Sequence, residues 1–113
     1  MPNIHVQTNI TLTPDKKTEI KEALGKAIET IPGKSERWLM VVLEGDKSMY
    51  FQGSGAPCAL CSVELLGSAS DAVYDKMTAV MTDLLSEKLS VPADRIYTKY
   101  TEFTHWGWNG SNF

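Results

Sequence analysis

Apolar positions recur along the chain with two different periods, which predict a strand, a helix and a second strand. Residues 4–8 alternate between apolar and polar side chains, as a half-buried strand does. Thr13 as N-cap and Pro14 as first helical residue begin a helix that Pro32-Gly33 ends. Its apolar stripe consists of Ile20, Ala23, Leu24, Ala27, Ile28 and Ile31. The unbroken apolar run at 38–43 predicts a strand covered on both faces.

The same order of elements repeats in the second half of the chain. Residues 58–66 are typical of a strand, and caps at 68–71 begin a second helix. Its apolar face consists of Val73, Met77, Val80, Met81, Leu84, Leu85 and Leu89. Residues 96–103 alternate as another strand. The two units are offset by roughly 56 residues when Ile4 is laid on Leu60.

Two such units predict the fold class. We expect one α/β domain over residues 1–113, a two-layer sandwich with a four-stranded mixed sheet and two antiparallel helices on one face. A further short strand is predicted at 49–51, between loop signals. The sheet face away from the helices would keep apolar residues, above all those of 38–43, so we expect it to be covered by oligomerisation.

Composition narrows the function classes. The 113 residues are 42% hydrophobic and 22% charged, which fits one ordinary globular domain. The chain has 11 Lys+Arg against 14 Asp+Glu, and this absence of a basic surplus argues against nucleic-acid binding. Its apolar runs are too short for membrane insertion, and residues 1–5 lack the features of a secretion signal. We therefore expect a protein made in the cytoplasm.

Three residues offer chemistry that needs no cofactor. Removal of Met1 would expose the secondary amine of Pro2, whose pKa burial and a neighbouring cation would lower. Lys34 could supply that cation and hold a carboxylate, or it could be a solvated lysine near a helix C-terminus. Tyr97 could donate a hydrogen bond to a carbonyl oxygen, or only pack within its strand.

The cysteines and histidines do not indicate a metal site. Cys58 and Cys61 form a C-x-x-C that suggests redox chemistry, but side chains three positions apart in a strand lie on opposite faces. We therefore interpret both as structural thiols. His5 and His105 have no acidic or cysteine partner at ligand or triad spacing, so no metal is expected.

The last ten residues are rich in aromatic and turn-forming side chains. Trp106, Trp108 and Phe113 would either wall a pocket for a flat substrate or anchor a neighbouring subunit. The local pattern leaves both alternatives open.

Several segments together resemble the macrophage migration inhibitory factor family of the tautomerase superfamily. They run in the family's order from the first residue to the last. The segments are Met1-Pro2, Thr8-Asn9, Gly33-Lys34, Gly53-Ser54, Pro57-Cys58-Ala59-Leu60-Cys61-Ser62, Asp94-Arg95-Ile96-Tyr97 and Gly107-Trp108-Asn109-Gly110-Ser111-Asn112-Phe113. The P-C-A-L-C-S run and the closing G-W-N-x-S-x-F are specific.

The resemblance implies a homotrimer and a keto–enol tautomerase that acts without a cofactor on phenylpyruvate-type and dopachrome-type substrates. Pro2, freed from Met1, would be the general base. Lys34 would bind the carboxylate, with Leu66 beside it through largely backbone contacts. Tyr97 would come from the adjacent subunit.

The pocket rim departs from the family pattern. The resemblance places Trp38, Lys99, Trp108 and Phe113 on this rim. Lys99 replaces an asparagine of the family, Trp38 a common tyrosine, and Trp106 a smaller aliphatic residue. We therefore expect a reshaped mouth of the active site.

The resemblance also implies a second class of function. The alternative to an enzyme is a cytokine-like signalling ligand that is released without a signal peptide and binds a cell-surface receptor, its tautomerase chemistry vestigial. A third hypothesis, a thiol–protein oxidoreductase using Cys58 and Cys61, is weakened by the strand geometry.

Overall fold

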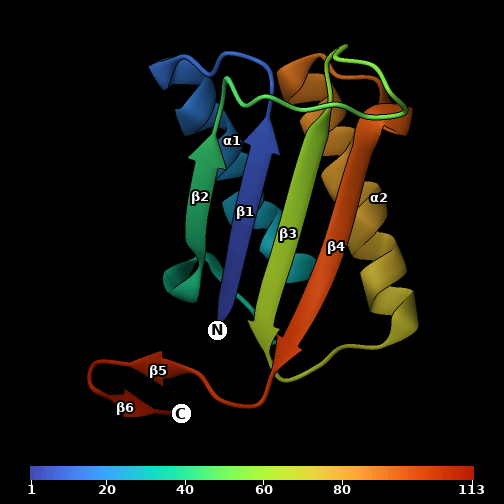
Figure 1. Cartoon of the computed structure of the whole chain (residues 1–113). Helices are drawn as coiled ribbons and strands as arrows, with labels where there is room; N and C mark the ends of the chain where they lie inside the picture. Colours follow the sequence, from blue (N-terminus) through green and yellow to red (C-terminus); the bar gives the residue numbers. More distant parts are fainter.

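A four-stranded sheet lies against two helices in the computed structural model, which describes all residues 1–113 (Figure 1). The elements are β1 (Pro2–Thr8), α1 (Pro14–Ala27), β2 (Met40–Glu44), β3 (Ala59–Leu66), α2 (Asp71–Leu89), β4 (Ile96–Phe103) and a hairpin of β5 (Gly107–Trp108) and β6 (Ser111–Asn112), with 3-10 turns at Ile28–Thr30, Glu36–Trp38 and Ala93–Arg95. The strand order is β2-β1-β3-β4, with β1–β2 and β3–β4 parallel and β1–β3 antiparallel. The predicted α/β fold class is confirmed. Neither helix has the length and apolar character of a membrane span.

Both helices begin with the same kind of cap. The Thr13 side chain accepts a hydrogen bond from the backbone N–H of Lys16, as predicted. The Ser70 side chain accepts one in the same way from the N–H of Val73. Each cap satisfies one of the backbone donors that a helix leaves free in its first turn.

The two caps reveal the true offset of the repeat. Thr13 and Ser70 are 57 positions apart, one more than predicted. An offset of 56 lays Ile4, buried beneath the helices, on Leu60, which faces the other side of the sheet. Because strand side chains alternate between faces, an offset of 57 is needed to match Ile4 with the buried Cys61.

The core lies between the sheet and the helices. Alternate residues of β1 and β3 are buried there, and each helix contributes a stripe of residues three or four positions apart. The largest fully buried side chains are Ile4, Val6, Ile20, Leu24, Ile28, Ile31, Val63, Leu65, Met77, Met81, Leu85 and Val91.

The sheet face away from the helices keeps apolar residues of the 38–43 run at its margin, as predicted, but its centre is mainly polar. On β1 and β3 its residues are Asn3, His5, Gln7, Leu60, Ser62, Glu64 and Leu66. Apolar side chains lie at its margins, where Met40 is 66% and Tyr97 62% exposed. The strand predicted from the run at 38–43 begins only at Met40 and is covered on one face, because the chain offers nothing to cover its other side.

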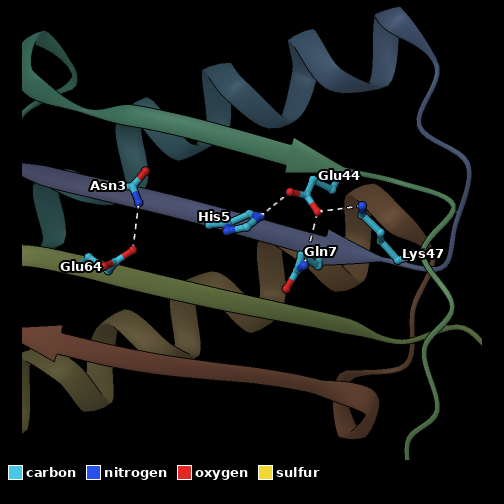
Figure 2. A network of polar contacts seen from close by, with 6 residues as sticks. All are labelled: Asn3, His5, Gln7, Glu44, Lys47 and Glu64. Carbon is cyan, nitrogen blue, oxygen red and sulfur yellow. Dashed lines mark hydrogen bonds and ion pairs between the residues drawn. The ribbon is translucent and has the colours of Figure 1, made fainter.

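A polar network crosses this face between β1 and β2 (Figure 2). His5 Nε2 lies 3.1 Å from Glu44 Oε1, and Gln7 Nε2 donates to Glu44 Oε2 at 3.3 Å. Lys47 Nζ lies 3.1 Å from the same carboxylate oxygen. Hydrogen bonds from Lys47 and then Gln7 hold the pKa of Glu44 below its ordinary value. The sequence suggested no acidic partner for His5, because only the pairing of the two strands brings Glu44 to it.

The predicted short strand at 49–51 is not formed. Phe51 instead pairs with Ser54 across a two-residue turn whose φ angles are both positive, 54° and 75°. The backbone carbonyls of this loop bind the side chains of Arg95 and Asn9 rather than a neighbouring strand. Contacts with residues about 40 positions away therefore override the local strand pattern.

Candidate active site

Pro2 begins β1 at the end of the sheet where β3 and β4 finish (Figure 1). It pairs with Leu65, and the backbone N–H of Leu66 donates to the Met1 carbonyl at 3.0 Å. Pro2 is buried and Met1 is half-buried. Strand pairing thus fixes the first two residues against the last residues of β3.

A tight turn brings Lys34 to the same place. The Lys34 N–H donates to the Ile31 carbonyl at 3.1 Å, and Pro32 and Gly33 occupy the two central positions. Gly33 has a φ of +80°, which this type II turn requires and which glycine adopts without strain. The half-buried Lys34 side chain donates from Nζ to the Leu66 carbonyl at 2.9 Å. The structure therefore brings Lys34 and Leu66 together beside the start of β1.

The surroundings make an amino group at this position a weak base. Burial, followed by the charge of Lys34 and a hydrogen bond with it, lowers the pKa of the Met1 amino group from 8.0 to about 6. An amine here is mostly neutral at pH 7. After removal of Met1, the amino group would be the nitrogen of Pro2, which is buried and pairs with Leu65, the residue before the one that binds Lys34.

A pocket of about 310 Å³ opens beside this end of β1. Its lining residues are Met1, Pro2, Asn3, Trp38, Met40, Trp106, Gly107 and Trp108. This volume lies at the lower end of the range for small-molecule sites, about 300–1,000 Å³. Asn3 and Met40 are not among the predicted site residues, because they are strand partners across β1 and β2 and meet only through the register of the sheet.

The side-chain amide of Asn3 has a hydrogen-bond partner for its nitrogen but none for its oxygen. Its Nδ2 donates to Glu64 Oε1 at 3.1 Å (Figure 2). Its Oδ1 is buried and has no hydrogen-bond partner in the chain. A buried acceptor without a donor costs free energy, so this amide favours binding of a molecule that brings a donor to the Oδ1 atom.

Aromatic rings join the C-terminal hairpin to the body of the protein. The ring centroids of Trp38 and Trp108 lie 4.9 Å apart in a T-shaped contact, and Phe113 lies 6.0 Å from each. The hairpin turn has positive φ angles at Asn109 and Gly110, 52° and 89°, as a type I′ turn requires. Trp38 and Trp108 thus wall the pocket, while Trp108 and Phe113 stay about half exposed and available to a neighbouring subunit.

Tyr97 and Lys99 lie away from Pro2 within one chain. Tyr97 pairs with Leu60 of β3, whereas Pro2 pairs with Leu65. Five residues of strand separate these positions, which is about 16 Å at 3.3 Å per residue. Lys99 is exposed and makes no ion pair. The predicted site residues therefore fall into two groups at different places on the sheet.

The two cysteines are unsuited to redox catalysis. Cys58 and Cys61 are both buried and form no disulfide. Burial raises the pKa of the Cys61 thiol to about 12, so the reactive thiolate is scarce. No group of three His, Cys, Asp or Glu side chains is placed to hold a metal ion.

Comparison with known proteins identifies the family of this chain. The profile described as "Macrophage migration inhibitory factor (MIF)" matches residues 1–113. The chain belongs to this family. The resemblance predicted from the sequence motifs is thereby confirmed, and with it membership of the tautomerase superfamily.

Relatives match the chain along its whole length. Macrophage migration inhibitory factor of Meriones unguiculatus is 32% identical over 115 residues, which cover 100% of this chain and 99% of the relative. The crystal structure of Leishmania major MIF2 is 31% identical, with a TM-score of 0.93 over 100% of this chain and 97% of that chain. A Prochlorococcus marinus homologue is 26% identical, with a TM-score of 0.84 over 98% of each chain.

The buried thiols lead to a prediction about reactivity. We expect Cys58 and Cys61 to resist iodoacetamide in the folded protein at mildly alkaline pH, because both are enclosed and the Cys61 thiolate is disfavoured. Intact-mass measurement should show no adduct before unfolding and two adducts after unfolding in guanidinium chloride. Rapid modification of the folded protein would show that the thiols are accessible and reopen the redox hypothesis.

Proposed function

We propose that the chain is a cofactor-free keto–enol tautomerase of phenylpyruvate-type substrates, with the Pro2 amine as its general base once Met1 is removed. The observation that carries this proposal is the amine site at the start of β1, where burial and Lys34 lower the pKa of the Met1 amino group, one residue before Pro2, to about 6. A base whose pKa lies near the working pH transfers protons efficiently. Family membership, which includes both tautomerase and cytokine-like roles, supports the same assignment.

The residues around the start of β1 offer one partner for each part of such a substrate. Lys34 would supply a cation for the carboxylate, and the Leu66 carbonyl orients the Lys34 ammonium group. Trp38 and Trp108 provide flat apolar surfaces for the aryl group.

The proton transfer needs no co-reactant. In the enol-to-keto direction, the enol hydroxyl loses its proton and its O–H electron pair completes the C=O bond. The electron pair of the C=C bond then takes a proton at carbon. The Pro2 nitrogen would accept the first proton and return one at carbon, so it ends the cycle in its starting form.

Assembly of several copies would supply the tyrosine that one chain does not bring to its own Pro2. We propose a homotrimer in which Tyr97 of a neighbouring copy approaches Pro2, because the two are about 16 Å apart along β3 within one chain. The apolar side chains at the margins of the open sheet face, Met40 and Val42 on β2 and Tyr97 on β4, would be covered by this contact.

The role of Pro2 is tested by the state of the N-terminus. Protein retaining Met1 should be slower by about 100-fold or more, because the Pro2 nitrogen is then an amide without a basic lone pair. Enol decay of phenylpyruvate, followed by ultraviolet absorbance, measures the rate, and intact mass verifies processing. N-acetylation of the Met1-retaining form removes the Met1 amine as a substitute base. Equal turnover in processed and acetylated Met1-retaining protein would exclude Pro2.

Lys34→Ala should weaken substrate binding and shift the pH profile. Loss of the charged hydrogen bond should raise KM for a carboxylated substrate by about 10-fold. Removal of a positive neighbour favours the protonated amine, so its pKa should rise and the acid limb of kcat/KM should move to higher pH. Lys26→Ala, which removes the same charge from the exposed last turn of α1, is the matched control. Identical profiles for the two variants would place Lys34 outside the site.

The shared site is tested by complementation. Light scattering should give three times the 12.5 kDa mass of one chain, and a monomer would refute the assembly. Pro2→Gly and Tyr97→Phe chains, refolded separately, should each be impaired. Refolded together in equal amounts, they should restore about one quarter of the sites, because an intact Pro2 then meets an intact Tyr97 from a neighbour. Absence of recovery in mixed trimers would show that Tyr97 is not shared.

A further inference from the structure

The ring of Tyr97 has one defined aromatic neighbour. Its centroid lies 4.9 Å from that of Phe51, with an angle of 90° between the rings. The side chain is otherwise 62% exposed, and its hydroxyl has no hydrogen-bond partner in the chain. The edge-to-face contact with Phe51 is therefore the main restraint on the direction of the Tyr97 hydroxyl.

Phe51 is itself held firmly. Its backbone N–H and carbonyl each bond to Ser54 at 3.0 Å, and its carbonyl also accepts from Arg95 Nη1 at 3.1 Å. The Arg95 guanidinium lies 5.3 Å from the centre of the Phe51 ring, within the range of a cation–π contact.

Arg95 ties this loop to the strand that carries Tyr97. Its Nε donates to the Pro57 carbonyl at 2.9 Å, and its Nη2 donates to the carbonyls of Ser54 and Ala56, both at 3.0 Å. Arg95 immediately precedes β4, in which Tyr97 is the second residue. The loop and the tyrosine are thus fixed to the same short stretch of backbone.

We propose that Phe51 is a positioning residue, which holds the Tyr97 ring in the orientation that the shared active site uses. The inference rests on the proposed function, since it assigns Phe51 a task only if Tyr97 reaches the substrate of a neighbouring copy. In the free chain, an exposed tyrosine on a strand samples several rotamers, and only one of them directs the hydroxyl at a given atom. The Phe51 ring favours one rotamer before the neighbouring copy and the substrate meet it, and this reduces the ordering needed on assembly and binding.

The test is a double-mutant cycle in the phenylpyruvate assay, with Phe51→Leu, Tyr97→Phe and the double variant. Leucine keeps an apolar side chain in the loop but removes the ring edge, so kcat should fall by about 3- to 10-fold. KM should change little, as in Tyr97→Phe, if the hydroxyl acts mainly on the developing charge of the transition state. In the Tyr97→Phe background, Phe51→Leu should cause no further loss, because the hydroxyl that it positions is already absent.

Two further variants separate positioning from loop stability. Phe51→Tyr restores an aromatic ring and should return kcat to within about 2-fold of the unaltered protein. Tyr50→Ala removes the neighbouring, 79% exposed aromatic side chain and should leave kcat unchanged. Light scattering and circular dichroism establish that each variant assembles and folds.

The outcomes distinguish the inference from the proposed function. Loss in Tyr97→Phe without loss in Phe51→Leu would overturn the role of Phe51 and leave the tautomerase proposal intact. Multiplied losses in the double variant would overturn it too, because Phe51 would then act independently of Tyr97. A Tyr97→Phe variant as active as the unaltered protein would remove both residues from the site, whereas Pro2 would still be judged by its own test.

Discussion

The antiparallel pairing of β1 with β3 is the interaction on which the rest of the structure depends. Each half of the chain makes its own parallel pair, β1 with β2 and β3 with β4, and the β1–β3 contact alone joins them into one sheet. The same pairing places Ile4 beside Val63 beneath the helices and Pro2 beside Leu65 at one end of the sheet. A slip of one residue would turn every side chain of β1 to the other face. The core and the candidate site therefore both depend on the register between β1 and β3.

The surroundings of the N-terminal amine set its proposed catalytic role against stability. The amino group beside Lys34 has a pKa lowered from 8.0 to about 6, so the unfolded chain binds its proton more readily. In the chain that bears Met1, this pKa shift destabilises the folded state least above pH 8. The free energy of unfolding falls as the pH decreases from 8 to 6. An ion pair with a carboxylate would remove the penalty, but it would also raise the amine's pKa and make the neutral base scarce at pH 7.

Sequence patterns predicted the elements well because caps and periodicity are local. Thr13 caps α1 as expected, and the four long strands lie where alternation or apolar runs predicted them. The strand at 49–51 failed because Arg95, far along the chain, binds its loop. In the candidate site, Pro32-Gly33 predicted the end of the helix before Lys34 and the family resemblance selected Lys34, whereas Asn3 and Met40 meet only through strand register. The sequence placed Met40 within a predicted strand and Asn3 directly before one, but it could not assign the strand partners.

The open sheet face and the separation of Pro2 from Tyr97 have a common geometric explanation. Pro2 lies at the end where β3 finishes, and Tyr97 lies near the start of β4 at the opposite end, so no bending of one sheet brings them together. A contact between unlike ends of two copies is heterologous, and it closes into a ring when the rotation between copies allows. In such a ring the margins of each sheet, with Met40 and Tyr97, become contacts between copies, while the polar centre around His5 faces inward. A polar centre with apolar margins fits the proposed closed ring, whereas a face-to-face dimer would bury the polar network and leave it without water.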